Sequence, residues 1–392
     1  MRTKVKLKGG ISLIVLVITI IVMIILAAAI ILSLSNSGII SKANKAKTDS
    51  DTANLKEYVN TLRAEWELMT ADEQTAEGSF EAYANKKLEK SGYKGAVGAD
   101  GEVYSNLNEN VMAAIRAGIK VGDVVTGYTV TSTTYETSGE ENTAPSRTET
   151  DPTKQTVTTN TDITWKYLGV NANGEMEIMA SLSTTEAAAA NTKVKLSGKG
   201  GYLKGPDMLN TICEKLYSVS GVGTARSMNI DDVNNILGYT GEKGAYYASS
   251  TTNYTPTKEA MKIGDIVSQK GEPALSNTAT PDGRDINTYY SDHYNINKIK
   301  DVKEMKNPGN RDLVYNAKNY YWLASPCVYV RFNSSRAYFG VRCVGSVGVY
   351  SNDMFYSYAG SCYETCAVPP VVSLKSNIQL KQNTEKTAWV IK

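Results

Sequence analysis

The sequence predicts an α+β protein in which a long N-terminal helix precedes a mixed domain of helices and strands. Three observations support this fold class: an uncharged apolar run at 11–34, helical periodicity from 42 to 69, and short β-branched or aromatic runs separated by turns after residue 120. Of the 392 residues, 42% are hydrophobic and 21% are charged, which suits globular material with one membrane element.

The N-terminus combines a basic leader with an apolar run. Residues 1–10 carry Arg2 and three lysines, and the 24 residues of 11–34 then carry no charge. As a helix this run would be about 36 Å long, which is enough to cross a bilayer. The positive charges before it favour a cytoplasmic N-terminus. We therefore expect a cell-membrane or cell-surface protein whose C-terminal domain is extracellular.

The helix is predicted to continue beyond the membrane, so that it spans 11–70. After Gly38 the sequence becomes charged, but apolar residues recur every three or four positions. This spacing forms a single apolar stripe along one side of a helix. The stripe consists of Leu55, Val59, Leu62, Trp66 and Met69.

The segment Lys8-Gly9-Gly10-Ile11-Ser12-Leu13-Ile14 resembles the processing site of type IV prepilins. The resemblance covers about residues 4 to 70 and implies cleavage between Gly10 and Ile11, with the apolar helices packing against other pilin subunits. The family usually carries Glu at the fifth mature position, where this chain has Val15. That Glu helps to register neighbouring subunits, so filament assembly stays open. The alternative is a plain signal anchor that holds an outside domain.

The middle of the chain is predicted to begin with a helical connector over 71–119, with helices at 81–90 and 106–117. Residues 131–161 are rich in Ser, Thr and Glu and nearly devoid of large apolar residues. We interpret them as a mobile insertion in the form of a long hairpin with arms at 125–130 and 155–161. A linker between domains is the alternative.

Strands and helices alternate after the insertion. Strands are predicted at 163–170 and 175–180 around a turn at 171–174. A helix within 200–219 would turn Cys213 and its apolar neighbours into the core. A second helix, over 229–237, begins with Asp231-Asp232, which we interpret as capping residues rather than a cation site.

The sequence offers little for catalysis or for nucleic-acid binding. The formal net charge of +2 gives no reason to expect a nucleic-acid partner. No nucleophile elbow, phosphate-binding loop or dinucleotide fingerprint occurs. The single His293 lacks a neighbouring nucleophile, and Cys362-x3-Cys366 is poor zinc spacing. We expect no catalytic residue, no metal and no cofactor, and hence not an enzyme.

The composition of Cys327–Pro369, called the window below, is the most unusual feature of the chain. Its 43 residues contain six Tyr, three of the four Phe and four of the five Cys, but no Lys, Gln, Trp, Leu or Ile. Tyr and Phe bury much area at low conformational cost, and Ser, Gly and Asn supply adaptable hydrogen bonds. This composition is typical of a binding face.

The order of elements from Trp165 onward resembles bacterial surface domains with a C-type-lectin or formylglycine-generating-enzyme-like fold. The late motif Tyr321-Trp-Leu-Ala-Ser325 matches the family pattern. The ending Val368-Pro369-Pro370-Val-Val-Ser-Leu374 also matches, with Pro369 where Arg is usual. The resemblance implies one lectin-like domain over 120–392, in which Trp322, Leu323 and the Val371-Val372 run are core.

Some members of this family are altered by diversity-generating retroelements, which randomise the adenines of a template. An AAC codon changed in this way never encodes Lys, Glu, Gln, Met or Trp. These five types make up 73 of the 349 residues outside the window, but only two inside it, Met354 and Glu364. The resemblance therefore implies that the window is a diversified face on a fixed scaffold. Exposed β-structure that is poor in Lys and Glu is the alternative.

The expected function is that of a surface adhesin or receptor for an unknown protein or glycan on a cell or phage surface. Because aromatic residues and Arg dominate binding hot spots, the expected contacts are Tyr329, Arg331, Phe332, Arg336, Tyr338, Arg342, Tyr350, Asp353, Phe355, Tyr356, Tyr358 and Tyr363. In an alternating strand about half of the positions point inward, so Tyr338 or Phe339 is expected in the core. Calcium-dependent sugar binding is not expected, since the usual Glu-Pro-Asn and Gln-Pro-Asp triplets are missing.

Two other functions remain open at the level of sequence. A structural type IV-like pilin subunit would form filaments and have no dedicated ligand. A formylglycine-generating-type oxidase would use bound copper and two cooperating thiols, for which Cys362 and Cys366 are the candidates.

Overall fold

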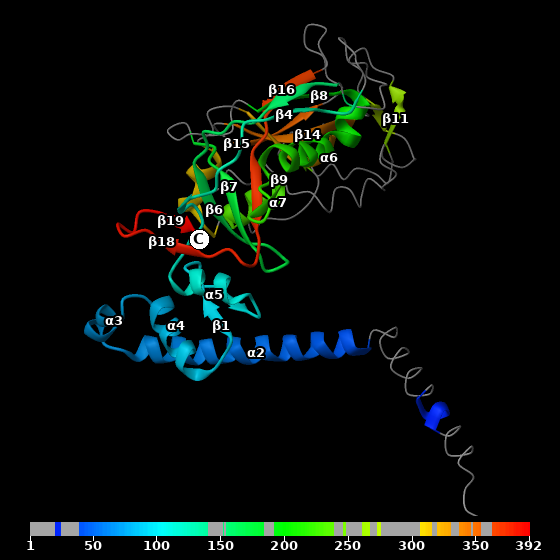
Figure 1. Cartoon of the computed structure of the whole chain (residues 1–392). Coiled ribbons are helices and arrows are strands. Elements are labelled where there is room, and N and C mark those ends of the chain that lie inside the picture. The colour runs from blue at the N-terminus through cyan, green and yellow to red at the C-terminus, as the bar shows by residue number, and fades with distance from the viewer. Residues whose placement is uncertain are drawn as a thin grey trace, which may run out of the picture. The chain divides into compact units, whose positions relative to one another are not determined.

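The computed structural model describes residues 20–24, 39–139, 152, 154–183, 192–238, 246–247, 261–266, 273–275, 306–315, 320–330, 337–345, 348–353 and 363–392. It has the predicted α+β composition, with helices and sheets in one chain (Figure 1). By its internal contacts the chain divides into two compact units. The first comprises 1–96 with 103–106, and the second comprises 97–102 with 107–392.

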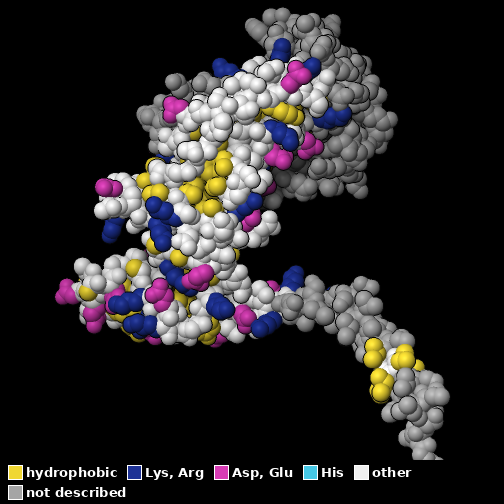
Figure 2. Space-filling view, in the orientation of Figure 1, with side chains coloured by type: hydrophobic (Ala, Val, Ile, Leu, Met, Phe, Trp, Pro, Cys, Tyr) yellow, Lys and Arg dark blue, Asp and Glu magenta, His cyan; other side chains and the backbone are white. Residues whose placement is uncertain are grey.

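The first unit is built on the 30-residue helix α2 (Ile39–Leu68), followed by α3 (Ala71–Glu77), α4 (Phe80–Ser91), β1 (Gly95–Val97) and β2 (Val103–Ser105). The predicted apolar stripe of α2 is confirmed: Leu55, Val59 and Leu62 are 1–2% exposed, and Trp66 and Met69 are half-buried. Trp66 packs against two aromatic rings of α4, at 6.3 Å from Phe80 and 5.6 Å from Tyr83 between centroids. The visible face of this unit carries charges of both signs (Figure 2).

The predicted helical connector over 71–119 is interrupted in the structure. The helix at 81–90 is confirmed as α4, and the one at 106–117 as α5 (Glu109–Arg116), which belongs to the second unit. The β1–β2 pair between them was missed, because its strands are only three residues long. At Gly95 an added Cβ would lie 2.3 Å from Leu55 Cδ2, so β1 approaches α2 more closely than a side chain would allow.

The predicted membrane span at 11–34 lies outside the described residues except for 20–24. Those five residues are helical and apolar, and their side chains are 46–64% exposed (Figure 2). Within the described part of the chain, no helix has the length and apolar character needed to span a membrane.

The second unit contains two larger sheets. One, called the β6 sheet, has the strand order β18-β19-β3-β6-β7-β17-β9. The predicted hairpin is confirmed as β6 (Trp165–Val170) and β7 (Met176–Ala180), paired antiparallel. The other strands are β3 (Val124–Thr126), β9 (Gly223–Ser227), β17 (Pro370–Leu374), β18 (Leu380–Gln382) and β19 (Trp389–Ile391).

The other sheet, called the β13 sheet, has the order β15-β14-β13-β16-β8, and β10 also pairs with β13. Its strands are β8 (Lys193–Ser197), β10 (Tyr246–Tyr247), β13 (Tyr321–Val330), β14 (Ala337–Gly345), β15 (Gly348–Asp353) and β16 (Tyr363–Ala367). A smaller pair joins β11 (Met261–Ile266) to β12 (Pro273–Leu275). The window thus supplies the last part of β13, Cys327–Val330, all of β14, β15 and β16, and the residues between these strands.

Helices cover the β13 sheet. The predicted helix within 200–219 is α6 (Gly198–Tyr217), which packs against β8, β9, β13 and β14 (Figure 1). Its predicted inward residues Leu209, Ile212, Cys213 and Leu216 are 0–3% exposed, as expected. The predicted helix at 229–237 is α7 (Ile230–Leu237), which packs near the short elements η3 (Pro308–Asn310) and α9 (Arg311–Tyr315).

The predicted insertion does contain a hairpin, but one of its arms was placed wrongly. The strands that pair are β4 (Thr134–Glu136) and β5 (Thr156–Thr158), so the second arm is correct and the first is not at 125–130. The apolar Val124-Val125 segment instead forms β3, where Val125 is 2% exposed between β6 and β19. Pairing with the distant strands β6 and β19 therefore determines where this segment lies, rather than its closeness in sequence to the insertion. Residues 140–151 and 153 lie outside the described residues.

Candidate binding face and its frame

The window enters the β13 sheet from a fully buried anchor. Tyr321, Trp322 and Leu323 at the start of β13 are each 0% exposed, as the sequence predicted for Trp322 and Leu323. The Trp322 indole Nε1 donates a hydrogen bond of 2.9 Å to the carbonyl oxygen of Val194 on β8. Trp322 therefore satisfies its one polar atom while burying its ring, which fixes β13 relative to β8.

The other border of the window is equally buried. Ala367 and Val368 are 0–1% exposed, and the following β17 places Val371 and Val372, both 0% exposed, between β7 and β9. The predicted buried β run is thus confirmed. Both chain segments that flank the window are core.

The two faces of the β13 sheet are covered by different helices. The positions of Tyr321, Val344 and Ala367 are cross-strand neighbours, and all three belong to the cluster formed with Val233 and Ile236 of α7. On the opposite face, Leu196 of β8 lies against α6, where an added Cβ at Gly205 would be 3.1 Å away. Cys366 and Cys343 occupy that second face and are buried.

The junction between β9 and α7 ties the window's two borders together. Met228, which is 0% exposed, donates its backbone N–H to Pro369 O at 2.9 Å and accepts from Ala324 N at 2.7 Å. Ser325 Oγ accepts a hydrogen bond of 2.9 Å from Ile230 N at the start of α7. One short segment thus holds both the start of β13 and the residue before β17.

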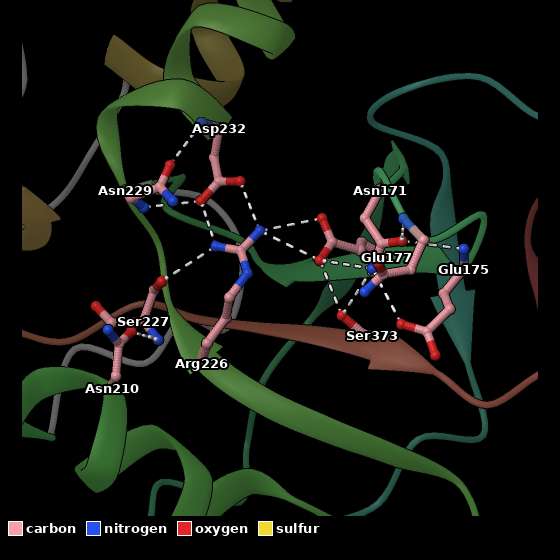
Figure 3. Close-up of polar contacts among 10 residues, drawn as sticks. Asn171, Glu175, Glu177, Asn210, Arg226, Ser227, Asn229, Asp232 and Ser373 are labelled. Atoms are coloured by element: carbon pink, nitrogen blue, oxygen red, sulfur yellow. Dashed lines mark hydrogen bonds and ion pairs between the residues drawn. The ribbon is translucent and has the colours of Figure 1, made fainter. Parts of the chain in front are cut away.

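A buried ion-pair network sits behind this junction (Figure 3). Arg226 of β9 binds Asp232 through two hydrogen bonds of 2.7 Å and Glu177 of β7 through two of 3.0 and 3.2 Å. The Asp232 and Glu177 side chains are 5% and 8% exposed, and that of Arg226 is 31% exposed. A planar guanidinium suits such paired recognition of carboxylates.

Neighbouring polar groups complete the network, since one guanidinium does not neutralise two carboxylates. Ser373 Oγ donates to Glu177 Oε1 at 2.9 Å, and the backbone N–H of Asn229 donates to Asp232 Oδ2 at 2.7 Å. Asn229 Oδ1 accepts from Asp232 N at 3.0 Å, so the two residues form a capping box. The predicted capping role is therefore confirmed for Asp232.

Burial alone would lower the pKa of the Arg226 guanidinium, but Asp232 and then Glu177 raise it above its usual range. Arg226 thus stays charged and joins β7, β9 and α7. We call Tyr321–Ser325, Met228, β17 and this network the frame. Arg226 and Glu177 could not be identified from the sequence, because each lies in an ordinary strand pattern and no spacing links them.

The predicted contact residues fall into three groups. The side chain of Arg342, on β14, is 2% exposed, so this position is buried rather than open, and Arg342 is withdrawn from the contact set. The backbone of β13 to β16 carries Tyr329, Tyr338, Tyr350, Asp353 and Tyr363. The remaining predicted contacts lie outside the described residues; they are Arg331, Phe332, Arg336, Phe355, Tyr356 and Tyr358. The predicted processing residues Gly10 and Ile11 also lie outside them.

The three cysteines whose side chains the structure describes, Cys213, Cys343 and Cys366, are buried. Burial raises the pKa of the Cys213 thiol well above its usual range, which suits the predicted core residue. Cys366 is 4% exposed, and Cys362 and His293 lie outside the described residues. Among the residues that the structure describes, no three His, Cys, Asp or Glu side chains gather as a metal-binding group.

No family model, no curated protein and no solved structure matches this chain.

Proposed function

We propose that the chain is a membrane-anchored surface protein that binds a protein or glycan on another surface through its window. It acts by recognition rather than catalysis. The observation that carries the proposal is the contrast at the window's borders. Tyr321–Leu323 before the window and Val371 and Val372 after it are 0% exposed core, whereas the window itself has the composition of a binding face.

The strand register suggests which positions take part. Tyr329 pairs with Tyr338, and Gly340 pairs with Asp353. Since partners share a face and residues alternate along a strand, these three non-glycine positions lie on the same face as Val344. Val344, which belongs to the α7 cluster, and Arg342 are buried on this face, and the three positions lie farther along the strands, level with Gly340 or beyond it. We assign Tyr329, Tyr338 and Asp353 to the contact set.

The same register places Tyr350 on the opposite face of the sheet. It pairs with Cys343, which is 0% exposed and lies on the face that α6 covers. Phe339 lies two residues before Val341 and four before Cys343 on β14, so the position of Phe339, and not that of Tyr338, shares the face of Cys343. The proposed diversified face thus consists of one side of the β13 sheet, at the end that carries Tyr329, Tyr338 and Asp353, together with the window residues between its strands.

The membrane anchor rests on the N-terminal sequence and on one described segment. At 20–24 five consecutive apolar side chains are 46–64% exposed, and exposed apolar surface is typical of sites that contact lipid or protein. A lipid bilayer satisfies it if the uncharged run 11–34 forms one helix. The domain resembling a C-type lectin would then stand outside the cell.

A structural pilin-like subunit is the second candidate, and the same exposed segment favours it. Helices of neighbouring copies would bury 20–24 as well as lipid does. N-terminal sequencing by mass spectrometry and electron microscopy of cells distinguish the two. Cleavage after Gly10 together with abundant filaments supports the subunit, whereas an uncleaved monomer supports the anchor.

The binding proposal is tested with the full chain, purified in a detergent without a sugar headgroup. The chain is applied to protein and glycan arrays, and the positive ligand is titrated against Tyr338→Ala and Asp353→Ala. We expect each variant to weaken binding at least about tenfold, which corresponds to about 1.4 kcal/mol. The control is Tyr320→Ala, because Tyr320 is 54% exposed but precedes the window. Equal binding by all three variants would contradict the assignment.

A further inference from the structure

A cavity of about 490 Å³ lies between the β4–β5 hairpin and α6. The hairpin contributes Tyr135 and Pro152 to its lining, and α6 contributes Lys204, Asp207, Met208 and Thr211. This volume lies within the range of small-molecule sites. None of these residues belongs to the window or to the frame.

The hairpin wall is held in place by hydrogen bonds that do not depend on the cavity. The Gln155 side chain bridges to the β8 backbone, accepting from Lys195 N at 2.8 Å and donating to Lys195 O at 3.0 Å. Thr137 joins the two arms through its backbone N–H, which donates to Gln155 O at 2.9 Å. Since β8 and β15 are opposite ends of the β13 sheet, the hairpin is attached at the end away from the window strand β15.

The α6 wall combines an apolar floor with a charged rim. Lys204, Asp207 and Thr211 follow helical spacing, so they share one side of α6. Lys204 and Asp207 are exposed, whereas Met208 is 9% exposed and Pro152 is buried. The rim thus presents one cation and one anion three residues apart on the helix.

We infer that this cavity binds a neutral saccharide unit of one or two rings. Sugar hydroxyls both donate and accept, so one ring can donate to the Asp207 carboxylate and accept from the Lys204 ammonium. The C–H faces of a sugar suit an apolar floor of Met208 and Pro152 beside Tyr135. An ion would meet a like charge on the rim, and a purely apolar ligand would leave both charges desolvated.

The test is saturation-transfer NMR on the full chain, in a detergent without a sugar headgroup. The probes are a panel of neutral mono- and disaccharides, with free amino acids as a zwitterionic comparison. The dissociation constant of the best saccharide is then measured for Lys204→Ala and Asp207→Ala. Matched controls on the same helix are Lys215→Ala and Glu214→Ala, whose residues are exposed and do not line the cavity.

We expect Lys204→Ala and Asp207→Ala each to raise the dissociation constant at least about tenfold, while the controls change it less than twofold. Circular dichroism checks that all four variants fold. The inference is overturned if no saccharide binds, if amino acids bind in preference, or if the four variants bind alike. It is also overturned if Tyr338→Ala, rather than the cavity variants, abolishes saccharide binding; that result would leave the proposed function intact.

Discussion

The two ends of the β13–β14 strand pair differ in their surroundings and in their composition. At one end Tyr321 faces Val344, and both are 0% exposed inside the cluster around α7. At the other end Tyr329 pairs with Tyr338 and Val330 with Ala337, within the window whose composition sets it apart from the rest of the chain. The difference suggests that stability resides in the frame and recognition in the window. Substitutions should therefore affect one property without the other.

The largest expected effect is on the frame, at Trp322. Trp322→Ala removes a fully buried ring and its hydrogen bond to Val194, so we expect a loss of about 3–5 kcal/mol in the free energy of unfolding. Chemical denaturation of the purified chain, followed by tryptophan fluorescence and circular dichroism, measures it. A loss below about 1 kcal/mol would show that the border of the window is not a rigid anchor.

Arg226→Ala should have the next largest effect. It leaves the carboxylates of Asp232 and Glu177 buried without their cation, which costs about 3 kcal/mol. Lys154→Ala is the control, because its ion pair with Glu136 is 3.0 Å long but lies nearer the surface, with side chains 30% and 60% exposed. That pair should contribute less than about 1 kcal/mol. Similar losses of unfolding free energy in the two variants would show that the Arg226 network does not stabilise the fold more than a surface ion pair does.

Alkaline pH should destabilise the folded chain by a somewhat smaller amount. Burial raises the pKa of Tyr217 to about 12, from an ordinary value of 10.0, and raises that of Tyr128 further. The folded chain then keeps protons that the unfolded chain releases, so stability is full below pH 10 and is lost as the pH rises toward 12. Tyr217 accounts for about 2 kcal/mol of this loss in the free energy of unfolding.

Unfolding free energies measured between pH 8 and pH 12 test this expectation, with Tyr217→Phe as the comparison. The variant loses hydrogen bonds to Thr192 and Asn160 at every pH, but its stability should fall less steeply above pH 10. A wild-type stability that does not change over this range would contradict the assignment of Tyr217 as a buried, protonated group.

The smallest expected effect is on the stability of window variants. Tyr338→Ser and Asp353→Ala should change the free energy of unfolding by less than about 0.5 kcal/mol, as surface substitutions do. The same denaturation experiment measures both, with Trp322→Ala as the reference for a frame position. A loss of more than about 2 kcal/mol at either position would place it in the core and remove it from the binding face.

Much of the fold follows from local patterns in the sequence. Helical spacing predicted α2, α4, α6 and α7, and alternating runs around Asn171–Gly174 predicted β6 and β7. Strands of three residues such as β1 and β2 carry too little pattern to be found this way. The wrong arm of the insertion has a different cause, because β3 is fixed by distant partners in β6 and β19.

The candidate site was harder to predict than the fold. Composition marked the window, but composition does not assign positions to faces, and Arg342 proved to be buried. Register resolves part of that ambiguity by grouping Tyr329, Tyr338 and Asp353. The frame's network joins residues 177, 226, 232 and 373, and such long-range pairing of charges has no signature in a single sequence.

Sequencing this gene from many related strains and mapping the substitutions tests directly whether the window is diversified on a fixed scaffold. We expect amino-acid changes to concentrate within 327–369, at adenine positions of a nearby template repeat. We expect Tyr321–Leu323 and Val371–Leu374 to stay unchanged. Substitutions spread evenly along the chain, or concentrated in the frame, would contradict a diversified window on a fixed scaffold.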